Sequence, residues 1–99
     1  MEDCLLVLFV APEIEDPLID WLLEREDVPG FSTQCVSGHG APPASLRLAE
    51  LVAGRRPRAR VEIALPRVVA PALLEALRRA FGGSGLHYWL LPLLEAGRV

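Results

Sequence analysis

The apolar and polar positions in the first third of the chain predict a strand, a helix and a second strand. Cys4–Val10 is apolar without a break, which predicts a strand buried on both faces. An amphipathic helix is expected to follow to about Glu26, starting either at Pro12 or at Asp16-Pro17, which resembles an N-cap and first-turn pair. Phe31–Val36 alternates in polarity, as a second strand would. The apolar face of the helix comprises Ile14, Leu18, Trp21 and Leu22.

A long connection and a third strand follow. The connection spans Gly38–Pro57, and such length inside a compact domain is uncommon unless the segment is functional or disordered. Within it, Ser45–Val52 has the pattern of a short helix ended by Gly54. Arg60–Leu65 alternates again, which predicts a third strand with Val61, Ile63 and Leu65 directed inward.

The last third predicts a helix and a fourth strand. The helix begins at Pro71 and is capped by Gly82. Leu86–Leu91 is expected to be the fourth strand, and residues 92–99 a short C-terminal tail. The apolar stripe of this helix comprises Leu73, Leu74, Leu77, Ala80 and Phe81.

This order of elements predicts one domain over residues 1–99, in the α+β class, with a ferredoxin-like βαββαβ fold. Such a fold has a four-stranded antiparallel sheet with two helices on one face. The other face of the sheet should be polar in a monomer, yet Cys4–Val10 and Leu90-Leu91 place apolar side chains on both faces. We therefore expect the open face to pack against other copies of the chain, in a homotrimer.

Composition supports a small domain with surplus apolar surface. The 99 residues suffice for one core, and 52% are hydrophobic against 23% charged. No segment approaches the length of a membrane span, and the N-terminus Met1-Glu2-Asp3 is acidic where a signal peptide is basic. We expect a cytoplasmic protein without direct membrane insertion. Its two cysteines, Cys4 and Cys35, are expected to be free thiols.

The charges are unevenly distributed and chemically restricted. Residues 1–27 hold nine acids and one base, whereas residues 28–99 hold four acids and nine bases. Every base is arginine, so Schiff-base chemistry on lysine and a lysine-type phosphate loop are excluded. The net charge of −3 and the lack of aromatics in the third strand argue against a nucleic-acid partner. Because no nucleophile with a paired base can be named, we expect a protein that is not an enzyme.

Two groups of residues are candidates for binding. Cys35 and His39 are types that ligate zinc or copper, although two residues cannot close a tetrahedral site and a packed thiol with a loop histidine explains them more simply. The four arginines Arg55, Arg56, Arg58 and Arg60 can grip phosphate or carboxylate, or form a solvated face. His87 is expected to be an ordinary strand histidine. If the third strand begins by Arg58, then Arg58 and Arg60 point to the same face.

Motifs along nearly the whole chain resemble a known family. Val36-Ser37-Gly38-His39-Gly40 and Arg58-Ala59-Arg60-Val61-Glu62-Ile63 bracket a long loop, as strands bracket the T-loop of PII signalling proteins. The segments Asp20–Leu23, Gly85–Trp89 and Leu94–Arg98 are similar to a family of uncharacterised PII-like proteins. The resemblance implies a ferredoxin-like trimer with a T-loop-like connection at 38–57, linked to heavy-metal efflux pumps of the resistance-nodulation-division type. CutA-type metal-tolerance proteins are similar in fold and in trimeric habit.

The resemblance leaves the ligand open. Nucleotide-binding PII proteins carry aspartate and lysine in a glycine-rich loop, whereas Gly82-Gly83-Ser84-Gly85 keeps only the glycines. The expected function is a PII-like sensor of a nucleotide or other small anion, with an efflux transporter as its partner. The alternatives are a copper- or zinc-binding protein that uses Cys35 and His39, and an interaction module without a ligand. The expected ligand-binding residues are Gly38, His39, Gly40, Arg55, Arg56, Arg58, Arg60, Gly82, Gly83, Ser84 and Gly85.

Overall fold

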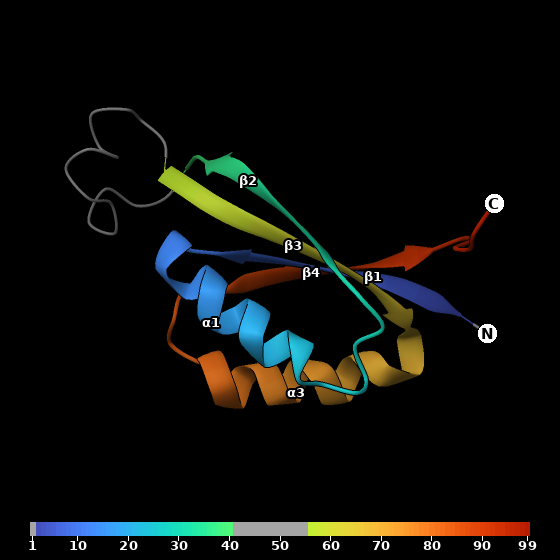
Figure 1. Ribbon diagram of the computed structural model, residues 1–99. Coiled ribbons are helices and arrows are strands. Elements are labelled where there is room, and N and C mark those ends of the chain that lie inside the picture. Colours follow the sequence, from blue (N-terminus) through green and yellow to red (C-terminus); the bar gives the residue numbers. More distant parts are fainter. Residues whose placement is uncertain (1, 41–55) are drawn as a thin grey trace.

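The structure is a computed structural model that describes residues 2–40 and 56–99. Its elements follow the order βαββαβ, with a short 3-10 turn, η2, before the second helix (Figure 1). The expected short helix at 45–52 and Arg55 lie outside the described residues. The elements are β1 (Asp3–Val10), α1 (Pro12–Leu23), β2 (Ser32–Gly38), β3 (Arg56–Pro66), η2 (Arg67–Val69), α3 (Ala70–Phe81) and β4 (His87–Leu93).

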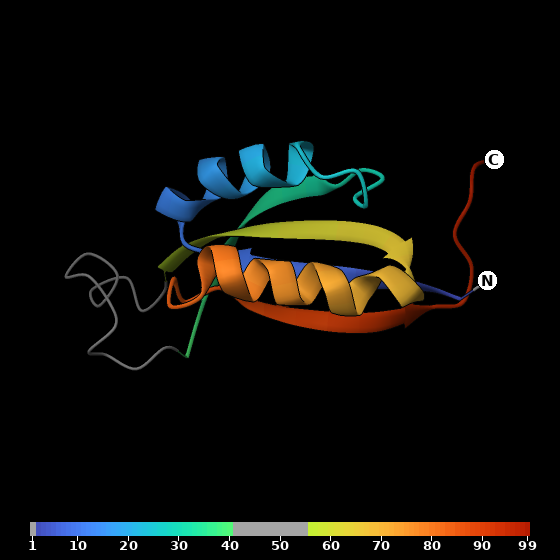
Figure 2. The same cartoon turned by 90° about the horizontal axis from the view of Figure 1, so that it is seen from below.

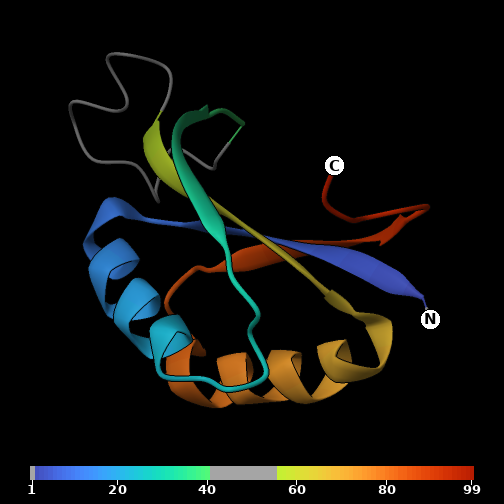
Figure 3. The same cartoon turned by 45° about the vertical axis from the view of Figure 1, so that its right-hand side comes forward.

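The four strands form one antiparallel sheet in the order β2-β3-β1-β4. Both helices lie on the same face of this sheet, so the molecule has two layers (Figures 2 and 3). The ferredoxin-like fold expected from the sequence is confirmed. In this order β1 and β3 are central strands, while β2 and β4 form the two edges.

The core lies between the sheet and the helices. Alternate residues of the central strands point toward the helices, because successive side chains of a strand lie on opposite faces. Val61, Ile63 and Leu65 are buried, as their alternation predicts. The helices contribute Leu18 and Leu22 from α1 and four residues from α3. The buried cluster comprises Cys4, Leu6, Leu8, Val10, Leu18, Leu22, Ala59, Val61, Ile63, Leu65, Ala70, Leu73, Leu74 and Leu77.

The opposite face of the sheet, here called the open face, carries no helix and is apolar over β1 and β4. The register pairs Val7 with Trp89 and Leu5 with Leu91, so these side chains share this face. Trp89 is 52% exposed and Leu91 is 40% exposed. The sequence prediction that β1 directs apolar groups both ways is therefore confirmed.

The structure decides between the two predicted starts of the first helix and places its end earlier than expected. It starts at Pro12, with Ala11 as its N-cap, and Pro17 lies inside it. A proline suits the first position because its fixed φ is helical and no N–H is needed there. The alternative start at Asp16-Pro17 is wrong. The helix ends at Leu23, three residues before the expected end.

The strand boundaries also differ from expectation, and β2 spans Ser32–Gly38 instead of Phe31–Val36. β3 begins at Arg56, because Arg56 and Pro57 pair with Gly38 and Ser37 of β2. The ends of the expected connection therefore belong to the sheet. β4 extends to Leu93, so the tail begins two residues later than predicted. Its Pro92 is tolerated because β4 is an edge strand, where one side of the backbone has no partner strand.

Within the described residues, neither helix has both the length and the apolar character needed to cross a membrane.

Gly82, the C-cap of α3, provides a test of this packing. A Cβ at this position would lie 2.5 Å from the carbonyl oxygen of Arg78, which also accepts the Gly82 N–H at 3.0 Å. Gly82→Ala is therefore expected to lower the free energy of unfolding by about 1–3 kcal/mol, measured by urea denaturation. Gly30→Ala is the control, since its Cβ would meet nothing within 4 Å. Equal losses in the two variants would contradict the expectation.

Candidate functional site

The arginines singled out in the sequence gather at one end of the sheet. There β2 ends at Gly38, opposite Arg56 at the start of β3. β1 ends and β4 begins at the same end, because Phe9 pairs with both Arg60 and His87. We call this the loop end of the sheet, since the connection between β2 and β3 leaves and returns here (Figure 1).

Arg58 and Arg60 both belong to the open face, as their two-residue spacing in β3 requires. Arg58 is only 8% exposed, which is unusual for a charged side chain. Arg60 donates to Glu62 at 2.8 Å. Its guanidinium carbon also lies 5.6 Å from the Phe9 ring centre and 5.7 Å from that of Trp89. Glu62 and the two aromatic rings thus hold the Arg60 side chain in position, while Arg58 places a buried positive charge at the loop end.

An aromatic group borders these arginines. The rings of Phe9 and His87 are stacked, with 4.8 Å between centres and 16° between planes. Trp89 meets Phe9 edge to face, also at 4.8 Å. Interpreting His87 as an ordinary strand histidine missed this arrangement. The signal was present in the alternation of β4, which puts His87, Trp89 and Leu91 on one face.

The pKa of His87 is lowered by its surroundings at the loop end. Its partial burial among its neighbours lowers the pKa of its imidazole, and the guanidinium groups of Arg58 and Arg56 lower it further. Burial lowers the pKa because it disfavours the charged form, and the arginines do so by repelling a second positive charge. These two arginines therefore add to the effect of burial on the pKa of His87.

Gly38 makes room for the same two arginines. A Cβ at Gly38 would lie 3.3 Å from the Cγ of Arg58 and 3.4 Å from the Cγ of Arg56. The stems of both side chains thus pass close to the backbone of β2. His39 and Gly40 follow immediately and are exposed; Gly40 has a positive φ of 82°.

The glycine-rich segment Gly82–Gly85 also lies at the loop end, since it leads directly into β4 (Figure 1). Its glycines have local structural roles: Gly83 and Gly85 have positive φ angles of 83° and 81°. The N–H of Gly82 donates to Arg78, and that of Ser84 donates to Phe81 at 3.1 Å. Those two amides are engaged within the chain.

The candidate metal ligands lie at the edge of the sheet. Cys35 is exposed on β2, and His39 is exposed just beyond the end of that strand. Among residues 2–40 and 56–99, no three side chains of the histidine, cysteine, aspartate or glutamate types gather as a metal site would require. Cys35 and His39 remain a pair without a third protein ligand in the described part of the chain.

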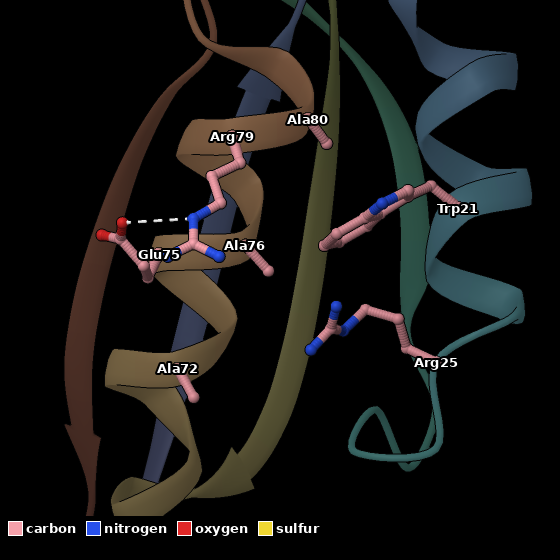
Figure 4. A pocket seen from close by; sticks show the side chains of 7 residues that line it. All are labelled: Trp21, Arg25, Ala72, Glu75, Ala76, Arg79 and Ala80. Carbon is pink, nitrogen blue, oxygen red and sulfur yellow. Dashed lines mark ion pairs between the residues drawn. The ribbon is translucent and has the colours of Figure 1, made fainter.

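A groove lies between the helices, on the far side of the molecule from the open face. This groove has a volume of about 540 Å³, and Figure 4 shows Trp21 and Arg25 facing the small side chains of α3. Arg25 lies 4.8 Å over the Trp21 ring and makes two 2.8 Å hydrogen bonds to Asp27. Arg79 pairs with Glu75 at 3.6 Å. Both arginines of this groove therefore pair with a carboxylate.

Comparison with solved structures places this fold among PII-like proteins. A crystal structure of a DUF3240 family protein from Shewanella baltica OS155 has 29% identity and a TM-score of 0.80, covering 98% of this chain and 96% of that one. CPII, a nitrogen regulatory PII-like protein from Thiomonas intermedia K12 bound to ADP, AMP and bicarbonate, has 19% identity and a TM-score of 0.73, covering 100% and 97%. The GlnK–ATP complex of B. subtilis has 16% identity and a TM-score of 0.64, covering 94% and 85%.

A family model described as "Protein of unknown function (DUF3240)" matches residues 1–99. No curated protein matches the chain. The likenesses to CPII and to GlnK establish a PII-like fold.

Proposed function

The chain belongs to the DUF3240 family, and from this membership and its PII-like fold we propose that it is a regulatory protein that binds a small anion at the loop end of the sheet. One observation carries the proposal. Arg58 is almost fully buried beside Arg56, at the place where the connection between β2 and β3 joins the sheet. Guanidinium groups form paired, charge-assisted hydrogen bonds with phosphate and carboxylate groups, so a site that keeps two of them together is suited to an anion.

The ligand that we propose is an adenine nucleotide or a small oxyanion. Two solved neighbours of the same fold are named as complexes with ADP, AMP and bicarbonate or with ATP. Arginine can form paired hydrogen bonds with a phosphate or carboxylate group. Phe9, His87 and Trp89 add ring faces next to the cationic groups, on which a base can stack.

The proposal includes assembly of three copies through the open face. Trp89 and Leu91 are large apolar side chains that a single chain leaves partly in water. A second copy of the same surface is their simplest cover, and a rotationally closed arrangement leaves no apolar face exposed. The loop ends of neighbouring copies then lie at subunit boundaries.

The proposed output is docking onto a partner, without a chemical step. The ligand site lies beside the end of β2 and the start of β3, so a bound ligand can form part of the surface that a partner contacts. The partner implied by the family resemblance is a heavy-metal efflux transporter. We include this transporter in the proposal as the first candidate to test by co-purification.

A thermal-shift screen tests the proposed function. ATP, ADP, AMP, bicarbonate, sulfate, zinc and copper are each added to the purified chain. A true ligand at about one hundred times its dissociation constant should stabilise the fold by about 2.7 kcal/mol, which corresponds to a midpoint rise of about 10–20 °C. We expect a rise with at least one anion. A rise with zinc or copper alone would favour the metal alternative on Cys35 and His39. An unchanged midpoint with every anion would refute the proposed site.

A further inference from the structure

We infer that His87 completes an oxyanion site with Arg56 and Arg58, and that this site holds its anion most tightly when His87 carries a proton. This inference rests on the proposed function, because it concerns the same loop end of the sheet. It adds as a binding residue His87, which the sequence predicts to be an ordinary strand histidine. It also specifies the ligand as an anion whose binding is accompanied by proton uptake.

The geometry assigns His87 to this site. Phe9 of β1 pairs with His87 of β4 on one side and with Arg60 of β3 on the other. Only one strand, β1, therefore lies between the histidine and β3. β1 ends one residue later, at Val10, and Arg58 lies one residue beyond the partner of Val10. At the loop end there is therefore no residue of β1 between Arg58 and β4. The Phe9 ring, stacked at 4.8 Å, holds the imidazole in place.

The charged groups around His87 are mostly cationic. On the open face, β3 contributes Arg56, Arg58 and Arg60, together with Glu62, which accepts a hydrogen bond from Arg60. β1 contributes Asp3, at the opposite end of the strand, and the open face of β4 has no charged residue. β2 presents Ser32, Gln34 and Val36 to this face. Glu13 opens α1 at the loop end.

These charges determine whether anion binding strengthens or weakens as pH falls. Without an anion, partial burial and the two arginines lower the pKa of His87, so the imidazole is neutral near pH 7. A bound anion offsets the arginine charge and accepts a hydrogen bond from the protonated ring, which raises the pKa. Since the complex then binds more protons than the free protein, affinity rises as pH falls through the pKa of the complex. The rise stops below the pKa of the free protein.

Sulfate is the probe for this inference, because its charge stays constant between pH 5 and pH 8. Isothermal titration with the full chain should show affinity increasing roughly three- to tenfold as pH falls from 7.5 to 5.5. Buffers with different ionisation enthalpies should report proton uptake on binding. In proton NMR, the imidazole signals of His87 should titrate at higher pH with sulfate present than without it.

A histidine variant and a matched control separate the outcomes. His87→Gln should remove the pH dependence, while Arg79→Ala, at an exposed residue of α3, should retain it. Binding of sulfate that depends on Arg58 but not on pH would overturn the role of His87 and leave the proposed function standing. This role would also be overturned if sulfate binding by the His87→Gln variant still depended on pH. Absence of binding by sulfate and by every nucleotide would overturn both.

Discussion

Light scattering of the purified chain in dilute buffer should give a particle of about three times the mass of one chain. The physical reason is the open face, where Trp89 is 52% exposed and Leu91 is 40% exposed on a two-layer domain with helices on one side alone. Apolar surface of this kind is stabilised by about 25 cal/mol for each Å² removed from water. A stable monomer would contradict the proposed assembly and would leave these side chains unexplained.

Leu91→Asp should convert this assembly to monomers, because it places a carboxylate without a partner in the proposed interface. Its matched control is Leu23→Asp, since Leu23 is an exposed leucine, 69% accessible, at the end of α1 on the helical layer. Light scattering and sedimentation at micromolar concentration distinguish the two. Far-ultraviolet circular dichroism checks that both variants fold. Dissociation of the control, or persistence of the assembly in Leu91→Asp, would place the interface elsewhere.

Arg58→Ala should weaken binding of the anion found in the thermal-shift screen by about tenfold to a hundredfold, the value of a charge-assisted hydrogen bond in a partly buried site. Arg79→Ala is the matched control, because the Arg79 side chain is 81% exposed on α3 and pairs with Glu75 across one helical turn. Isothermal titration gives both affinities. Small and equal losses of affinity in the two variants would show that the arginines of β3 form a solvated surface and not a binding site.

The fold was predictable because its signals are local and repeated. The unbroken apolar run of β1 and the alternation in β3 indicate buried strands directly. Boundaries were less certain, since they depend on pairing with a distant strand. Arg56 and Pro57 carry no strand signal of their own, and they join β3 because Gly38 and Ser37 lie opposite them.

The candidate site was predictable only in part. Arg58 and Arg60 were identified because four arginines in six residues are conspicuous in a sequence. The burial of Arg58 was not predictable, since it depends on neighbours from other strands, such as Gly38 of β2, which lies close to the Arg58 stem. His87 was missed because its significance comes from a ring on another strand, Phe9, which lies 78 positions earlier in the sequence. Spacing along a chain carries no information about such a contact.

The central claim is that a small anion binds at the loop end of the sheet, and a crystal structure of the chain grown with ADP or sulfate tests it most directly. The proposal predicts a phosphate or sulfate group within hydrogen-bonding distance of Arg58, with Arg56 and His87 beside it. An anion bound instead in the groove between α1 and α3, next to Arg25 and Arg79, would contradict it.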